Sequence, residues 1–230
     1  MKRVFWLLAI SALVLGACKK DKNKGDAPLV VNPYDLVGSW LCTDYIDPEG
    51  EHQPYAASLE SLLFSIKDLT YYAPYFDGGK YTFDNFKVDG NKLILAEGSE
   101  MEMIFHVKAL DGKHLSWIQY VDDKDFIQES YINVSRILPG KWTVNYPDGS
   151  TTATIDAKGS FVEEYSTDPP QVLNCEWLLS HMGNKLSILV WEVDRDSDLW
   201  ETEYTILSMT DDRIETKQSK SDANVVFVRQ

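Results

Sequence analysis

The sequence predicts an all-β protein of two tandem antiparallel β-barrels, each small and either closed, incompletely closed or flattened toward a sandwich, with one helical insertion in the first. Three observations carry this prediction. Apolar and polar residues alternate in short runs, turn-forming pairs separate those runs, and one set of landmarks occurs in each half of the chain.

Alternation with a period of two marks the strands. It is clear in residues 101–108 around Phe105 and again in residues 200–207 around Tyr204. Such alternation is typical of sheets that bury one face and expose the other. Asp-Gly and Gly-Asn pairs supply the positive φ values of tight hairpins, and they separate the runs at Gly90-Asn91, Asp111-Gly112 and Asp148-Gly149.

The landmarks recur in the same order. Asp35-Leu36-Val37-Gly38-Ser39-Trp40 is echoed by Ile137-Leu138-Pro139-Gly140-Lys141-Trp142, and Gly90-Asn91-Lys92-Leu93 by Gly183-Asn184-Lys185-Leu186. The halves end in Asn133-Val134-Ser135-Arg136 and Val226-Phe227-Val228-Arg229. Because the order is kept, we place a first β-domain at residues 34–136 and a second at residues 137–230.

One segment breaks the β pattern. Apolar residues fall at helical spacing behind Ser58, a suitable N-cap, at Leu59, Leu62, Leu63, Ile66 and Leu69. The second half has no counterpart, so we interpret this segment as a helix inserted in the first domain. Tyr71, Tyr72 and Tyr75 follow it, and they are either an exposed platform for a ligand or aromatic residues that fill a core.

The N-terminus has the three parts of a bacterial secretory signal. Lys2 and Arg3 precede an apolar run over residues 4–15, and Leu15-Gly16-Ala17-Cys18 resembles a lipobox, the site of cleavage by signal peptidase II. We therefore expect residues 1–17 to be removed, Cys18 to carry lipid, and residues 18–33 to form a disordered tether. The lipid would anchor the protein in the cell envelope, on the outer membrane of a Gram-negative bacterium.

The composition restricts the partners. The chain has 36 acidic against 22 basic residues and a formal charge of −14. This balance argues against nucleic acid, since phosphate binding needs clustered Lys and Arg. Membrane contact is expected only through the lipid on Cys18. The other cysteines, Cys42 and Cys175, are either a disulfide or two buried thiols.

The recurring Gly-x-Trp, with an Arg near the end of each half, resembles the frame of the lipocalin-like, calycin-type barrels. In that family the Trp closes one end of the barrel and an Arg of the final strand packs across its ring. The resemblance implies that Trp40 pairs with Arg136 and Trp142 with Arg229. It also implies a binding role, although each half is only about 100 residues long, which limits the size of a ligand.

Sequence motifs for catalysis and for metal or cofactor binding are not found. The four His residues show no paired spacing, and Asp194-Arg195-Asp196-Ser197-Asp198 begins like a calcium loop but has Leu199 and Thr205 at two required positions. We expect no cofactor and no enzymatic activity. The remaining hypotheses are a binding protein for a small apolar or glycan ligand, a structural or interaction subunit of an envelope complex with filled barrels, and, third, a hydrolase.

Overall fold

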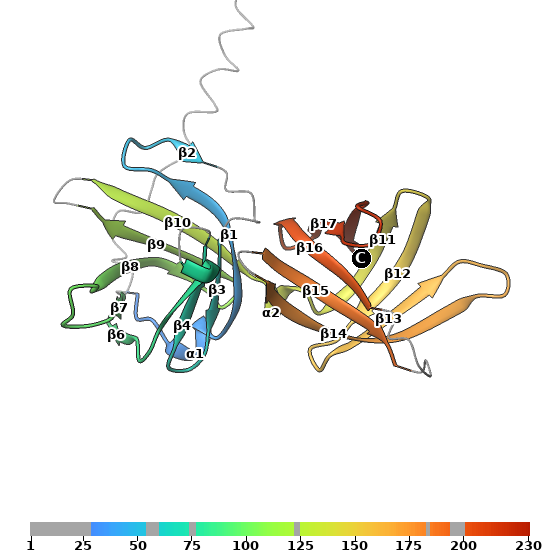
Figure 1. Ribbon diagram of the computed structural model, residues 1–230, viewed down its shortest axis with the longest axis horizontal. Helices are drawn as coiled ribbons and strands as arrows, with labels where there is room; N and C mark the ends of the chain where they lie inside the picture. Colours follow the sequence, from blue (N-terminus) through green and yellow to red (C-terminus); the bar gives the residue numbers. More distant parts are fainter. Residues whose placement is uncertain (1–28, 54–59, 74–76, 122–124, 183–184, 194–200) are drawn as a thin grey trace, which may run out of the picture.

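The computed structural model describes residues 29–53, 60–73, 77–121, 125–182, 185–193 and 201–230. Most of these residues form two antiparallel sheets, an open, curled sheet of ten strands and a closed barrel of eight. Figure 1 shows the open sheet on the left and the barrel on the right, with α2 between them. The all-β prediction with two tandem antiparallel sheets is confirmed.

The open sheet has the order β5-β4-β3-β1-β10-β9-β8-β7-β6, and β2 pairs with β1. The strands are β1 Gly38–Ile46, β2 His52–Gln53, β3 Ser61–Phe64, β4 Leu69–Tyr72, β5 Lys80–Phe83, β6 Lys87–Asp89, β7 Lys92–Leu95, β8 Met103–Leu110, β9 His114–Tyr120 and β10 Phe126–Asn133. A short 3₁₀ helix, η1 Asp77–Gly79, precedes β5. This half is thus a half-barrel, which is the incompletely closed form of the prediction.

The second sheet runs β11 to β18 in chain order and closes because β11 pairs with β18. Its strands are β11 Gly140–Tyr146, β12 Gly149–Ile155, β13 Ser160–Tyr165, β14 Gln171–Met182, β15 Lys185–Glu192, β16 Glu201–Met209, β17 Arg213–Gln218 and β18 Asn224–Arg229. The interior is filled by side chains such as Trp142, Phe161 and Phe227, all essentially buried. No helix in the described residues is long and apolar enough to cross a membrane.

The same local structure begins each sheet. Asn32 caps the single turn α1 Pro33–Leu36, and Asn133 caps the single turn α2 Val134–Ile137. A glycine with positive φ then leads into the first strand, at Gly38 with φ of 136° and at Gly140 with φ of 152°.

The tryptophan two residues later is fully buried in both copies, and its indole N–H donates to the carbonyl four residues before it. The distance is 2.5 Å from Trp40 Nε1 to Leu36 O and 2.8 Å from Trp142 Nε1 to Leu138 O. This bond holds the helical turn against the end of each sheet.

The predicted helix over residues 59–69 is wrong. Residues 61–72 form the hairpin β3–β4, in which Leu62 and Leu69 face the core while Ile66 lies exposed in the turn. Ser65 Oγ accepts from the amide of Asp68 at 2.8 Å and closes that turn. Apolar residues three or four apart also fit two short strands around a turn, and pairing of β3 with β1 decides between the two structures. Ser58 and Leu59 lie outside the described residues.

The predicted tether is too long at its C-terminal end. Val31 is 3% exposed, and its amide donates to Gly90 O at 2.9 Å, so residues 29–33 belong to the folded body. Residues 1–28, which include the predicted signal and Cys18, lie outside the described residues. The disordered tether therefore remains a prediction for residues 18–28 only.

The two sheets share a packed interface. Leu41 on β1 and Ile132 on β10 are opposite each other in register and belong to the same buried cluster as the barrel core. Beside them, the His181 ring on β14 lies between two hydroxyls, with Nδ1 3.1 Å from Ser61 Oγ and Nε2 3.2 Å from Ser39 Oγ.

Two further contacts join the halves. Tyr72 stacks on the His181 ring at 4.2 Å between centroids. His114 links the halves through carboxylates, with Nδ1 3.1 Å from Asp111 and Nε2 3.2 Å from Asp211. Both carboxylates raise the pKa of this exposed His, although partial burial opposes the shift.

Burial lowers the pKa of His181 from 6.5 to about 4, because the interface disfavours the charged ring. A depressed folded-state pKa means that stability is fully present above pH 6.5 and is lost as the pH falls toward 4. We expect the free energy of unfolding to fall by roughly 3 kcal/mol over this interval on account of His181. Urea denaturation at pH 7 and pH 4 measures the change.

His181→Gln should remove this part of the pH dependence, because it has no group that titrates in the interval. The control is His52→Gln, since the side chain of His52 is 68% exposed. If wild type and His181→Gln lose the same stability between the two pH values, protonation of His181 does not weaken the interface.

Candidate functional site

The closed end of the barrel contains Trp142 and Arg229. The guanidinium carbon lies 4.2 Å from the centroid of the indole ring, and Nε donates to Asp211 O at 2.7 Å. Nη2 donates to Ile137 O, so the same cation also holds the end of α2. The structure therefore brings together one of the two Trp and Arg pairs implied by the resemblance.

The first half places Arg136 differently. In strand register Trp142 is opposite Arg229, whereas Trp40 is opposite Asn133. The backbone agrees, because Asn133 N donates to Lys113 O at 2.7 Å in the same way that Arg229 N donates to Asp212 O at 2.8 Å. The structural equivalent of Arg229 is thus Asn133, and assigning that place to Arg136 was wrong.

Arg136 instead connects the two helical turns. It lies on α2, where it donates to Tyr34 O at 2.7 Å, and its Nη1 is 3.9 Å from Asp35 Oδ1. In the sequence comparison, Arg136 of the first half was matched with Arg229 of the second. The strand pairing instead matches Arg229 with Asn133, which is three residues before Arg136.

The predicted tyrosine platform is not an exposed surface. Tyr71 is 5% exposed and points into the first sheet, and Tyr72 is covered on one face by His181. Tyr75 lies outside the described residues. Tyr71 nevertheless lines a cavity, which is the candidate site.

This cavity lies at the end of the first sheet away from Trp40 and has a volume of about 230 Å³. Its lining combines apolar and aromatic side chains with three polar ones: Tyr45, Glu60, Tyr71, Met103, Phe105, Gln119, Ile127 and Glu129. These residues come from β1, β4, β8, β9 and β10 and from the residue before β3. We call it the Glu129 cavity.

Glu129 is the most constrained group in the cavity. It is 7% exposed, yet both carboxylate oxygens accept hydrogen bonds, Oε2 from Trp117 Nε1 at 2.5 Å and Oε1 from the Tyr71 hydroxyl at 3.2 Å. Burial raises its pKa, and the bonds from Trp117, Tyr131 and Tyr71 oppose that shift without cancelling it. The site thus holds a carboxyl group that favours its neutral form more than an exposed Glu does.

A second carboxyl group lines the same cavity. Glu60 is 3% exposed and lines the cavity together with Glu129. Burial is the main cause that raises the pKa of the Cys42 thiol and of the Tyr131 hydroxyl, and both carboxylates add to it. The interior therefore disfavours further negative charge.

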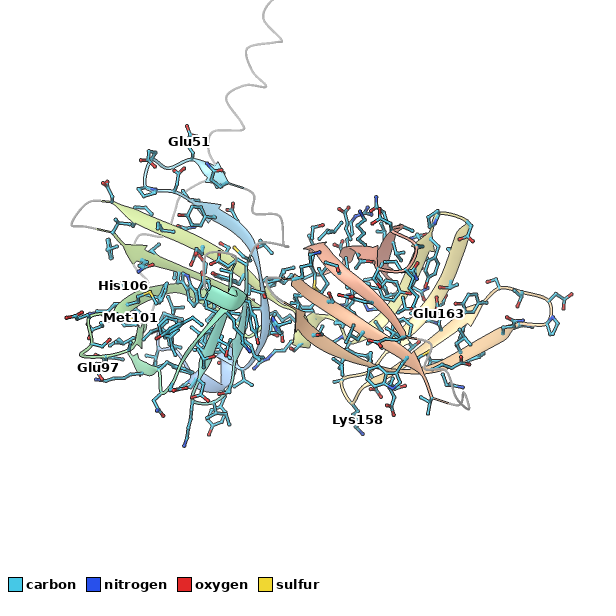
Figure 2. All side chains as sticks on the ribbon, viewed as in Figure 1. Glu51, Glu97, Met101, His106, Lys158 and Glu163 are labelled. Atoms are coloured by element: carbon cyan, nitrogen blue, oxygen red, sulfur yellow. The ribbon has the colours of Figure 1, made fainter. Side chains whose placement is uncertain are left out.

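The barrel has a comparable cluster at its end away from Trp142. Glu163, labelled within the barrel in Figure 2, is 3% exposed. It accepts from Thr151 Oγ1 at 2.5 Å, from the Tyr146 hydroxyl at 2.8 Å and from the Tyr165 hydroxyl at 3.1 Å. Burial raises the pKa of Tyr204, which contacts Tyr146, to about 12. Each half thus buries a glutamate among hydroxyl or indole donors.

Sequence reasoning missed all three buried glutamates. A sequence pattern does identify Glu129. Ile127, Glu129 and Tyr131 occupy alternate positions of β10, so all three face the interior.

The two cysteines are free and buried, in agreement with the thiol alternative and not with a disulfide. Burial, with the nearby Glu163 and Glu192, raises the pKa of Cys175 to about 11. Among the described residues no group of His, Cys, Asp and Glu could hold a metal ion. The segment Asp194–Asp198 that begins like a calcium loop lies outside them.

Replacing Arg229 with Ala should destabilise the protein by about 3 kcal/mol, because a cation–π contact and charged hydrogen bonds to backbone carbonyls are lost together. Arg136→Ala should cost about 1 kcal/mol, since it removes one hydrogen bond and a half-exposed ion pair. Urea unfolding compares the two variants. Equal losses would contradict the assignment of Asn133 as the equivalent of Arg229.

Glu129→Gln should change how stability depends on pH. A raised folded-state pKa means that the contribution of Glu129 is fully present below its unfolded pKa and is lost as the pH rises through the folded value. Between pH 4 and pH 7 the free energy of unfolding of wild type should therefore fall relative to that of the variant, as measured by urea unfolding. Glu164→Gln, on the exposed face of β13, is the control. Parallel profiles for wild type and Glu129→Gln would refute the raised pKa.

Comparison with known proteins gives distant structural neighbours. No family model matches this sequence, and no curated protein matches it significantly. The chain is similar to a lipocalin-like protein from Bacteroides uniformis at 17% identity and a TM-score of 0.33, over 43% of this chain and 98% of that one. It is also similar to a protein of unknown function of the DUF3598 family from Nostoc punctiforme at 12% identity and a TM-score of 0.30, over 85% of this chain and 95% of that one.

Proposed function

We propose that this protein binds a small ligand in the Glu129 cavity and is held in the cell envelope by lipid on Cys18. The observation that carries the proposal is a cavity of about 230 Å³ in which the polar side chains of Glu60, Gln119 and Glu129 lie among apolar and aromatic ones. Ligand sites in proteins generally have this composition. The lipobox-like Leu15-Gly16-Ala17-Cys18 supports the anchor.

The lining limits the chemistry of the ligand. The volume is below the 300 Å³ or more of sites for drug-sized molecules, so the ligand is smaller than those. Met103, Phe105 and Ile127 offer contacts to an apolar or ring-shaped body. Gln119 and the carboxyl groups offer hydrogen bonds to hydroxyl or amine groups. A small amphipathic molecule or a single sugar unit fits both requirements, whereas an anion does not.

The geometry favours binding over catalysis at this place. Both oxygens of Glu129 are engaged by Trp117 and Tyr71, which fixes the carboxyl group, and the residues that line the cavity include no Ser, Cys or His to act as a nucleophile or partner base. A long apolar ligand is also a poor fit, because the neighbouring interior is filled by Trp117, Tyr131 and Phe64.

The filled interior of the barrel favours a second candidate function. With Trp142, Phe161 and Phe227 occupying its interior, the barrel acts as a rigid support that presents its outer face to another envelope component.

Native mass spectrometry of the full chain, purified in mild detergent from the membranes of its own host, tests the proposal. We expect two additions to the mass of the cleaved chain. The ligand is lost on denaturation, and the lipid on Cys18 remains. Ile127→Trp should abolish the first addition by filling the cavity and leave the second unchanged. Circular dichroism confirms folding, and Met103→Phe replaces this variant if it does not fold.

The matched control is Val172→Trp, which adds the same ring on β14, where Val172 is 53% exposed. It should keep both additions. A wild-type chain without a removable mass, or an Ile127→Trp chain that retains it, would refute binding in the Glu129 cavity. The absence of a mass that persists through denaturation would refute the lipid anchor.

A further inference from the structure

The outer face of the barrel carries an aromatic ring between two carboxylates. Across β14 and β15, Glu176 is opposite Trp191, and across β15 and β16, Trp191 is opposite Glu201. Their chain neighbours Val190 and Thr202 are 2% and 1% exposed inside the barrel. Because side chains alternate along a strand, Trp191 and Glu201 face outward.

A groove of about 620 Å³ runs along this face. Trp191 and Glu176 line it together with Ser160, Asn174, Leu178 and Lys158, and Figure 2 labels Lys158 at the lower edge of the barrel. A second hollow of about 230 Å³ adjoins it and is lined by Leu178, Leu189, Trp191 and Glu201. We call the two together the Trp191 groove.

The groove is open to a partner. Leu178 is 43% exposed and Val193 is 53% exposed, which places apolar surface beside the ring. The groove borders the barrel core at Cys175 and Trp177, while Trp142, Phe161 and Phe227 fill the interior.

Within the described part of the chain, neither Glu176 nor Glu201 forms an ion pair. By contrast, Glu203, two residues further along β16, accepts a hydrogen bond from Ser187 Oγ at 2.8 Å. Strands lie about 4.8 Å apart, so the backbone positions of Glu176 and Glu201 are about 10 Å apart, with that of Trp191 between them. A cation placed over Trp191 would attract both carboxylates and also the face of the ring.

We propose that the Trp191 groove binds an extended basic peptide segment. An Arg side chain of the segment stacks on Trp191 between Glu176 and Glu201, and an adjacent apolar side chain enters the hollow at Leu178 and Leu189. Arg suits this place because its planar guanidinium both stacks on aromatic rings and pairs with carboxylates. A neutral glycan could stack on the same ring, but it would leave both carboxylates without a counter-charge.

Fluorescence anisotropy tests the proposal with the full chain and a labelled peptide, Ser-Arg-Leu-Arg-Leu-Ser, blocked at both ends. We expect binding that weakens as salt is raised, and no binding of the peptide in which Gln replaces both Arg. Glu176→Gln and Glu201→Gln should each weaken binding about threefold to tenfold, and Trp191→Ala by a similar factor. Trp191→Phe should retain part of the affinity.

The matched control is Glu164→Gln, which removes one exposed charge from the outer face of β13, away from the groove. Because the chain carries a net charge of −14, a cationic peptide can also be attracted without a site. An equal loss with Glu164→Gln would therefore overturn the proposal. It would also be overturned if the Arg peptide did not bind, or if cellohexaose bound instead in a way that depends on Trp191 and not on salt.

Discussion

The hydrogen bond from a buried tryptophan to the carbonyl four residues before it is the constraint on which both halves depend. An indole N–H without a partner in a fully buried site would be costly, so Trp40 and Trp142 each require a helical turn at a fixed place. The preceding Asn caps that turn, and the glycine with positive φ redirects the chain into the first strand. The rest of each sheet extends away from the end at which this helical turn lies.

The two interiors also resemble each other at the end away from the tryptophan. Each buries a glutamate and surrounds it with neutral donors instead of a basic side chain: Trp117 and Tyr71 around Glu129, and Tyr and Thr hydroxyls around Glu163. Such donors hold a carboxyl group in place without supplying charge. The half-barrel keeps a cavity beside its glutamate. The difference follows from closure, because eight closed strands leave an interior that side chains can fill.

The sequence was informative where a feature depends on local chemistry. The Gly-x-Trp landmarks mark the start of both sheets, and the alternating runs around Phe105 and Tyr204 became β8 and β16. The sequence was misleading where strand pairing between distant segments determines the structure. The apolar spacing behind Ser58 fits a helix, but β1 offered a partner for β3, and the common Arg at the two ends concealed that Asn133 occupies the place of Arg229. The buried glutamates were hidden among 36 acidic residues, since only the fold distinguishes an inward from an outward carboxylate.

Leu41 and Ile132 lie on the outer face of the open sheet, yet they are buried in the same cluster as the barrel core. Separating the halves would expose both side chains, together with the hydroxyls that now contact His181. The repeat therefore does not yield two independent modules. Unfolding should be cooperative across the boundary at α2, and the half-barrel should lose its stability when the barrel melts.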